Sequence, residues 1–250
     1  QTLDRLNLVG LRQAIEAIHF PTKLPAAEIG KQRLAFNELL FLQLRSLRKK
    51  LDWKKNKASY QLPLSSTPVD QFISKLPFEL TPSQKRSIDE ILTDLKKEFP
   101  MNRLLEGDVG SGKTVVAAIA AFVSFINGYQ SVFMAPTQIL AQQHFNTLNS
   151  LLQPFKVRIS LLTSDIKTSD LGRSDIFVGT HALIHNKIAF DKVALVVIDE
   201  QHRFGVEQRA HLVKETGSKR IAPHILTMTA TPIPRTVALT FYGDLDLSTL

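Results

Sequence analysis

A glycine-rich loop is the stretch of this sequence whose residue types and spacing most directly suggest chemistry. Gly107, Gly112, Lys113 and Thr114 satisfy the pattern G-x-x-x-x-G-K-[ST], with a further glycine at Gly110. Such a loop lets the backbone curl around a phosphate chain and point its N–H groups at it. Lys113 is then placed to reach the β- and γ-phosphates of a nucleotide, and the Thr114 hydroxyl to bind Mg²⁺. The residues expected to contact the nucleotide are Gly107, Asp108, Val109, Gly110, Ser111, Gly112, Lys113 and Thr114.

Two adjacent carboxylates, Asp199 and Glu200, follow the apolar run 194–198. In open α/β sheets ligands collect at the carboxyl ends of strands, so a strand ending at Asp199 places both acids beside the phosphate loop. We expect Asp199 to hold Mg²⁺ and Glu200 to orient and deprotonate the attacking water. A pair of acids after a strand is by itself an ordinary loop start. The phosphate loop earlier in the chain is what favours the catalytic interpretation.

The elements that position these residues follow from the alternation of short β-rich runs with helical runs. The alanine-rich run Val115–Phe125 predicts a buried helix directly after the loop, and this context disfavours a glycine turn that binds nothing. Thr81, Pro82 and Gln84 form the capping-box pattern of another helix start. The predicted fold class is therefore α/β, a P-loop domain with a parallel sheet flanked by helices. The expected strands are Leu104–Glu106, Val132–Ala135, Arg158–Leu162, Ile176–Gly179, Leu195–Asp199 and Ile225–Thr229.

An all-α extension with one long helix is predicted before this domain. Leu3–Ile18 has helical apolar spacing, and residues 26–55 hold a run with an apolar stripe and almost no helix breaker. Ser59–Pro68 is rich in Ser and Pro and has no hydrophobic period, which indicates a linker. We therefore expect a helical connector over residues 1–58, a linker over 59–75 and the nucleotide-binding domain over 76–250.

Composition sets further bounds. The chain has 250 residues, 44% of them hydrophobic and 22% charged, which is ordinary for a globular protein. It has no cysteine, which excludes disulfides and fits a reducing cytoplasm, and it has neither a long apolar run nor a signal pattern, so we expect no membrane partner.

The net charge of +8 is concentrated near the N-terminus. Residues 1–75 carry 13 Lys and Arg against 6 Asp and Glu. A solvated helix end and a patch that contacts nucleic-acid phosphates remain equal alternatives for this basic run. Its members are Arg45, Arg48, Lys49, Lys50, Lys54, Lys55 and Lys57.

Several stretches resemble the motifs of superfamily 2 helicases. Gly107–Thr114 and Asp199–His202 resemble motifs I and II, and Thr229–Thr236 resembles motif III. Residues 135–144 (APTQILAQQH) resemble motif Ia, and residues 178–183 (VGTHAL) resemble motif Ib. The run DEQHRFGVEQR from Asp199 narrows the resemblance to the bacterial RecG family of ATP-dependent DNA helicases. Ile18–Pro21 and Arg33–Leu39 also resemble that family, which more often has Glu where Asn37 stands.

The resemblance implies further roles for residues of this chain. Gln84 resembles the glutamine that reads adenine, although its capping-box position is a sufficient reason for a glutamine there. Residues expected to couple nucleotide state to DNA grip are Gln201, His202, Thr229 and Thr231. Residues expected to contact DNA are Thr137, Gln138, Thr180 and His181, with an N-cap as the plainer role for Thr137.

The family's activity implies ATP and Mg²⁺ as cofactors and branched double-stranded DNA, such as stalled forks and Holliday junctions, as the partner. We expect a monomer whose full-length chain adds a wedge domain and a second RecA-like domain with a catalytic arginine. The stretch in hand would then be a first RecA-like domain that hydrolyses ATP very slowly alone. Two alternatives are a transcription-repair coupling translocase, which typically has Glu where Gln201 stands, and a phosphate-loop enzyme acting on a small molecule.

Overall fold

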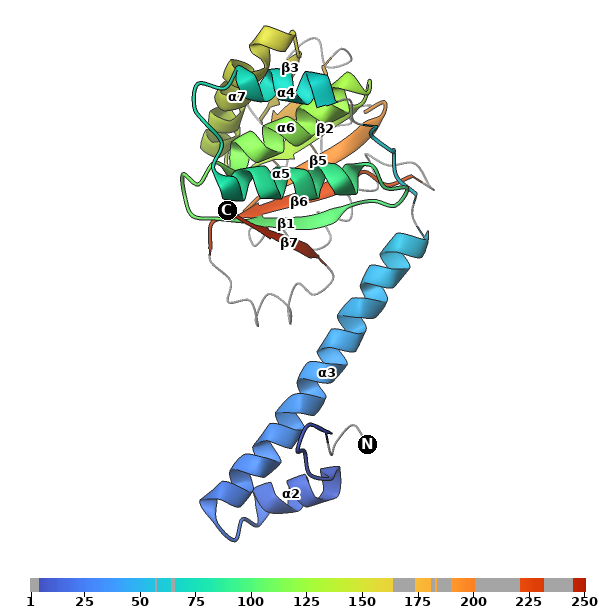
Figure 1. Cartoon of the computed structure of the whole chain (residues 1–250), viewed down its shortest axis with the longest axis vertical. Helices are drawn as coiled ribbons and strands as arrows, with labels where there is room; N and C mark the ends of the chain where they lie inside the picture. The colour runs from blue at the N-terminus through green and yellow to red at the C-terminus, as the bar shows by residue number, and fades with distance from the viewer. Residues whose placement is uncertain are drawn as a thin grey trace. The chain divides into compact units, whose positions relative to one another are not determined.

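The computed structural model describes residues 5–56, 58–63, 66–163, 174–180, 183, 190–200, 221–231 and 245–250 (Figure 1). These residues fall into two compact units. One holds residues 5–51, and the other holds the described residues from 52 to 250.

The first unit is helical, but the helix that the apolar spacing predicts from Leu3 begins at Leu11, because Gly10 stands at its N-cap. Helix α2 (Leu11–His19) begins after Gly10, and α3 (Leu24–Asn56) continues past residue 51 into the second unit. The two helices approach closely at Gly30, where an added Cβ would lie only 2.6 Å from the carbonyl oxygen of Ala14. Glycine at this position therefore lets the backbones touch, and Ala14 is fully buried.

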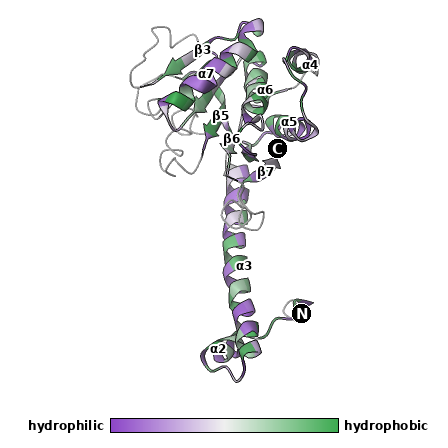
Figure 2. Ribbon diagram, turned by 90° about the vertical axis from the view of Figure 1, so that its left-hand side faces the viewer, coloured by the Kyte–Doolittle hydropathy of each residue, from purple (hydrophilic) through white to green (hydrophobic). Residues whose placement is uncertain are grey.

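The apolar stripe expected along α3 is present but exposed. Leu40, Leu44 and Leu47 have 44%, 56% and 50% of their surface accessible. Figure 2 shows hydrophobic and hydrophilic residues interleaved along α3, whereas α6 (Lys113–Ile126) is mostly hydrophobic. At 33 residues α3 is long enough to span a bilayer, but it is too polar to do so. Within the described part of the chain, no helix has both the length and the apolar character that crossing a membrane requires.

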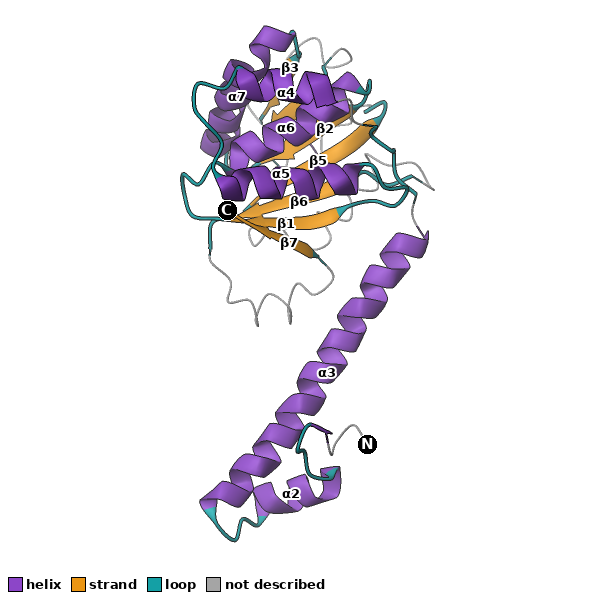
Figure 3. Ribbon diagram, in the orientation of Figure 1, coloured by secondary structure: helices purple, strands orange, loops and turns teal. Residues whose placement is uncertain are grey.

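A parallel sheet forms the centre of the second unit (Figure 3). Its order is β3-β4-β2-β5-β6-β1-β7, and every described pairing is parallel. The strands are β1 (Asn102–Glu106), β2 (Gln130–Met134), β3 (Ile159–Leu162), β4 (Ile176–Gly179), β5 (Val193–Asp199), β6 (His224–Thr229) and β7 (Asp246–Thr249). The six expected strands and the predicted fold class are confirmed. The edge strand β7 was not predicted, because four residues of mixed polarity carry little strand signal.

Both faces of this sheet carry apolar side chains. Successive residues of a strand point to opposite faces, so neighbouring apolar residues fall into different clusters. Phe133 and Val197 face a core shared with four helices, while their neighbours Val132 and Val196 join a second apolar cluster. The helices of the first core are α4 (Ser66–Ser74), α5 (Pro82–Leu95), α6 (Lys113–Ile126) and α7 (Gln138–Leu152). A short 3₁₀ helix, Gln153–Phe155, follows α7. The near-continuous apolar character of α6 is thus explained by burial against the sheet.

The stretch expected to be a linker is instead packed into the second unit. Leu62 is fully buried, and its N–H donates to the Leu95 carbonyl. Helix α4 follows, and its Phe72 stacks with Phe122 and Phe155 at centroid distances of 5.1 and 5.4 Å. Ser- and Pro-rich composition concealed this packing, because a few well-spaced apolar residues are enough to anchor a short segment.

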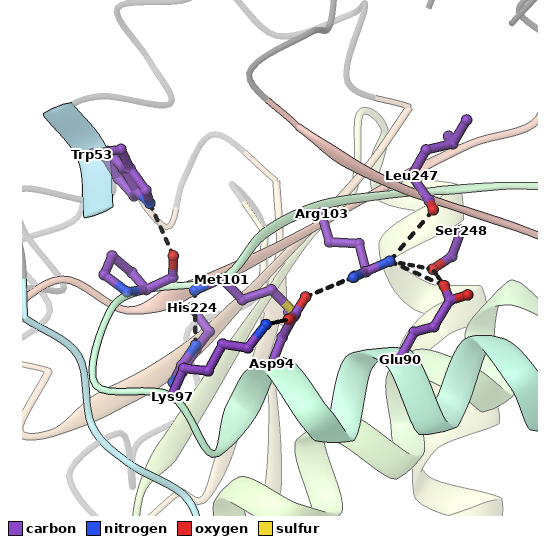
Figure 4. A network of polar contacts seen from close by, with 10 residues as sticks. Trp53, Glu90, Asp94, Lys97, Met101, Arg103, His224, Leu247 and Ser248 are labelled. Atoms are coloured by element: carbon purple, nitrogen blue, oxygen red, sulfur yellow. Dashed lines mark hydrogen bonds and ion pairs between the residues drawn. The ribbon is translucent and has the colours of Figure 1, made fainter. Parts of the chain in front are cut away.

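A buried arginine ties α5 to two strands (Figure 4). Arg103 of β1 donates from Nε to Asp94 at 2.9 Å and from Nη1 to Glu90 at 3.0 Å, both on α5. The same Nη1 donates to the Ser248 hydroxyl of β7 at 2.7 Å. Removing one partner of such a buried pair costs on the order of 3–5 kcal/mol, because the other charge is left uncompensated. The network therefore holds the edge strand to the helix that carries Gln84.

A buried histidine holds the residue that precedes β1. Nδ1 of His224 accepts the Met101 backbone N–H at 3.0 Å, so Nε2 carries the proton and donates to the Tyr60 carbonyl at 2.8 Å. The bond from Met101 requires the neutral ring, because in a protonated ring Nδ1 also carries a proton and cannot accept. Burial lowers the pKa of His224, and the hydrogen bond to Tyr60 and the charge of Asp94 oppose that shift only in part.

Acid should therefore destabilise the second unit through His224. An unfolded histidine gains a proton near pH 6.5 while the folded one stays neutral, so this stabilisation is complete above about pH 6.5 and is lost as the pH falls. We expect the thermal midpoint of the wild type to drop between about pH 7.5 and about pH 5. His224→Gln should be less stable at about pH 7.5, by about 1–3 kcal/mol per unsatisfied backbone group, and should depend less on pH.

The control variant is His19→Gln, because His19 is exposed. It should keep the wild-type stability and pH dependence. An equal acid loss in the wild type and in His224→Gln would contradict the role given to His224.

Candidate active site

The glycine-rich loop joins β1 to α6 as the sequence predicts. Gly110 and Gly112 have φ angles of 81° and 87°, in the left-handed region that other residues rarely adopt. Gly112 is the N-cap of α6, and a Cβ on it would lie 2.3 Å from the Gln84 amide nitrogen. A Cβ on Gly110 would meet nothing within 4 Å, so the loop is open at that point. Two of the loop's glycines, Gly110 and Gly112, thus serve backbone conformation, and Gly112 also serves close packing.

Lys113 lies folded over this loop. Its Nζ donates to the carbonyls of Gly107 at 2.7 Å and Asp108 at 2.8 Å. Burial lowers the pKa of Lys113, and the nearby carboxylates of Asp199, Glu200 and Asp108 oppose the shift. A partly desolvated ammonium held by neutral carbonyls gains strongly from an anion, so the lysine suits a phosphate group.

Other groups of the loop also fit a nucleotide's phosphates and Mg²⁺. In the part of the chain that the structure describes, Ser111 Oγ is buried without a hydrogen-bond partner, the kind of orphan group that bound phosphate can satisfy. Thr114 lies in the first turn of α6, next to Lys113. Its hydroxyl and a carboxylate are ligand types that Mg²⁺ prefers.

Asp199 and Glu200 diverge at the carboxyl end of β5. Asp199 is the last residue of the strand and is largely buried, and its Oδ2 lies 2.7 Å from Nε2 of His144 on α7. Glu200 has a φ of 52°, a left-handed conformation that costs a non-glycine residue on the order of 1–2 kcal/mol. Its Oε1 accepts the Ala230 backbone N–H at 3.3 Å. The turn at Glu200 therefore sends one carboxylate toward α7 and the other toward the end of β6.

Backbone hydrogen bonds join the loop, these acids and the turn after β6. The Gly107 N–H donates to the Thr229 carbonyl at 3.2 Å, and the Glu200 N–H donates to the Met228 carbonyl at 3.0 Å. The hydroxyls of Thr229 and Thr231 are 2.9 Å apart, and the Thr231 N–H donates to Thr229 Oγ1. Of the predicted coupling residues, Thr229 is thus bonded directly to the loop, and its two chain neighbours, Met228 and Ala230, are bonded to Glu200. Thr231 is bonded to Thr229. Gln201 and His202 lie outside the described residues.

Gln84 makes contacts at both ends of its amide. Its Oε1 accepts the Thr81 N–H at 2.9 Å and completes the predicted capping box, while its Nε2 donates to the Ser111 carbonyl at 2.8 Å. The capping role is confirmed, and the bond to the phosphate loop is a contact that the sequence did not predict.

The described residues among those expected to contact DNA follow the carboxyl ends of two neighbouring strands, β2 and β4. Thr137 is the N-cap of α7, and its Oγ1 accepts the Leu140 N–H at 3.3 Å. Gln138 is exposed in the first turn of the same helix. Thr180 directly follows β4, the strand beside β2, and its carbonyl accepts the Leu183 N–H. His181 lies outside the described residues.

His144 is the site residue that sequence reasoning missed as an individual. In the sequence it stands only as the last residue of the APTQILAQQH stretch. Its seven-residue distance from the N-cap of α7 places it two helical turns on, but no local pattern pairs it with an aspartate 55 positions later.

Comparison with known proteins agrees with this geometry. The family model described as DEAD/DEAH box helicase matches residues 81–240, more than half of the chain. The chain belongs to the DEAD/DEAH box helicase family. That membership favours a helicase over the small-molecule enzyme considered above.

Within this family, the expected resemblance to RecG is confirmed. The chain is 44% identical to the ATP-dependent DNA helicase RecG of Synechocystis sp. over 254 residues, covering 98% of this chain and 30% of that protein. It is 42% identical to RecG of Bacillus subtilis, covering 95% and 36%. A solved structure of RecG bound to a three-way DNA junction superposes with a TM-score of 0.84 at 39% identity, covering 99% of this chain and 34% of that one. The chain therefore spans about a third of the length of these relatives.

Binding and chemistry should separate at Lys113 and Glu200. Lys113→Ala should weaken Mg²⁺–ATP affinity about ten- to hundredfold, because a charged hydrogen-bonding group contributes about 1.5–3 kcal/mol. Glu200→Gln can still accept the Ala230 N–H, so affinity should stay near wild type while turnover falls by roughly 10²–10⁴. Affinity is measured by titration of a fluorescent nucleotide, and turnover by phosphate release from the whole protein.

Lys96→Ala and Glu98→Gln are the matched controls, since both residues are exposed near the other end of α5. Both controls should behave as wild type. A comparable loss of nucleotide affinity in Glu200→Gln and Lys113→Ala would refute the assignment of Glu200 as the base.

Proposed function

We propose that this chain is the nucleotide-binding half of an ATP-dependent DNA helicase of RecG type. The observation that carries the proposal is the junction of three strand ends. The phosphate loop after β1, the acids after β5 and the threonine turn after β6 are joined by direct hydrogen bonds. Such a junction can pass a change at the nucleotide to backbone elsewhere in the protein, which a simple hydrolase does not need. The similarity to RecG over nearly the whole chain supports the same conclusion.

In this proposal each site residue has a defined task. The loop N–H groups and Lys113 bind the phosphates of ATP. The Gln84 side-chain amide has two N–H groups; one donates to the Ser111 carbonyl, and the other contacts adenine. Thr114 and Asp199 hold Mg²⁺, which neutralises charge on the β- and γ-phosphates when bound. Glu200 orients the water and takes its proton.

The whole protein completes the machine. We propose that the second described unit is a first RecA-like domain and that α2 and α3 connect it to a wedge domain. A second RecA-like domain supplies the arginine that stabilises charge on the transferring phosphoryl group. The protein acts in the cytoplasm as a monomer on branched DNA, including stalled forks and Holliday junctions. Thr137, Gln138, Thr180 and His181 contact the DNA, and Gln201, His202, Thr229 and Thr231 couple it to ATP.

Branched DNA should therefore stimulate ATP turnover by the full-length protein. We expect more phosphate release with a three-way junction than with linear duplex of equal length, and unwinding of the junction only when ATP and Mg²⁺ are present. The 250-residue chain alone should turn over ATP about 10³–10⁵ times more slowly, because it lacks the arginine of the second domain.

Full-length Glu200→Gln is the control for contaminating ATPases, since it should bind the junction and leave it intact. Turnover that ignores DNA altogether would contradict the proposed function. ATP turnover by the 250-residue chain at the full-length rate would contradict the proposal that a second RecA-like domain supplies a catalytic arginine.

The basic run offers a test of additional DNA contact. Arg45, Arg48 and Lys49 are exposed and, at spacings of three and four residues, share one face of α3. Lys54 lies over the Phe99 ring at 5.0 Å, which favours packing for that residue. If all three exposed cations touch phosphate, replacing them with Gln lowers the magnitude of the log–log salt slope of duplex affinity by up to about 2.7.

The control is a triple variant in which Lys23, Lys31 and Lys96 are each changed to Gln. These residues are exposed, and their replacement removes the same number of positive charges outside the basic run. Duplex affinity is measured across a salt series, with the thermal midpoint as a check of folding. Equal slopes for the two triple variants would assign the basic run to a solvated helix face.

A further inference from the structure

A histidine stands in the otherwise apolar buried face of α7. Ala141, Leu148 and Leu152 of this helix are fully buried, and His144 lies on the same face by spacing. Its side chain is only 11% exposed, and its ring lies 6.5 Å from that of Phe133 on β2. A polar ring in such a place needs a hydrogen-bond partner, and the partner it has is Asp199.

The contact constrains the carboxylate in a particular way. An ionised carboxylate can only accept, so His144 donates from Nε2 to Oδ2 at 2.7 Å. The Asp199 side chain is 12% exposed, and in the described part of the chain no hydrogen bond reaches its other oxygen, Oδ1. One oxygen is therefore fixed by α7 while the other remains available to a ligand.

We propose that His144 is a positioning residue that holds the Asp199 carboxylate in the orientation needed for Mg²⁺. The inference rests on the proposed function, since it assigns Mg²⁺–nucleotide to this site. Carboxylates that bind metals are commonly held by a second hydrogen-bonding group, and loss of that group typically costs about 10–100-fold in metal affinity. His144 does not touch the nucleotide in this scheme. It acts only through Asp199.

A purely structural histidine would behave differently. If His144 only satisfied its own buried nitrogen, replacing it would change the stability of α7 and leave the response of the site to Mg²⁺ intact. The position of the donor distinguishes the two roles. Glutamine can place an amide N–H near the position of Nε2, whereas the shorter asparagine places it near Nδ1 and out of reach of Asp199.

The test measures ADP affinity of the full-length protein with a fluorescent ADP derivative, once in excess MgCl₂ and once in EDTA. The wild type should bind more tightly with Mg²⁺. His144→Leu and His144→Asn should lose about 10–100-fold in Mg²⁺-dependent affinity and keep the affinity in EDTA. His144→Gln should recover most of the loss. Asp199→Asn is the reference for a lost ligand, and Gln143→Leu, at an exposed neighbouring position, is the matched control.

The outcomes separate two failures. Mg²⁺-independent nucleotide binding by the wild type would overturn the proposed site itself. If the wild type binds ADP more tightly with Mg²⁺ but His144→Gln and His144→Asn respond equally to Mg²⁺, the role of His144 alone is overturned. The comparison of these two variants remains valid even if His144→Leu does not fold. Thermal midpoints of all variants identify any that are unfolded.

Discussion

The parallel register of β5, β6 and β1 is the constraint on which the site depends. Parallel strands end at the same edge of a sheet, so the residues after their carboxyl ends become neighbours although they are far apart in sequence. Here Gly107 pairs through its N–H with Thr229, and Glu200 pairs through its N–H with Met228. A slip of β6 by one residue would exchange the two faces of that strand and break both bonds. The geometry of the phosphate loop is thus inseparable from the packing of the sheet core.

Burial and charge work against each other at this edge. Lys113, Asp199 and Glu200 are partly withdrawn from water, and each has a specific hydrogen-bonding neighbour. The loop carbonyls hold Lys113, His144 holds Asp199, and the Ala230 amide holds Glu200. The left-handed turn at Glu200 shows the cost of this arrangement, since the conformation is unfavourable for a side chain and is maintained by the strands on either side.

Support for the site extends to residues outside the phosphate loop and the two acids. Gln84 of α5 reaches the Ser111 carbonyl, and α5 is itself fixed to β1 and β7 through Arg103, Glu90 and Asp94. His224 attaches the segment around Tyr60 to the amino end of β1. The strand that precedes the phosphate loop is therefore held at its amino end, and residues outside the loop contribute to the loop's position.

Local sequence determined the parts of this protein whose physics is local. The glycine pattern, the caps at Thr81 and Thr137 and the six predicted strands each depend on residues within a few positions of one another, and the structure has all of them. The tertiary structure alone decided the docking of residues 58–63, helix α4 and the edge strand β7. It also decided the pairing of His144 with Asp199 and of Glu200 with Ala230. These features join residues tens of positions apart, and their energy comes from burial and hydrogen bonds that exist only after the sheet has brought the partners together.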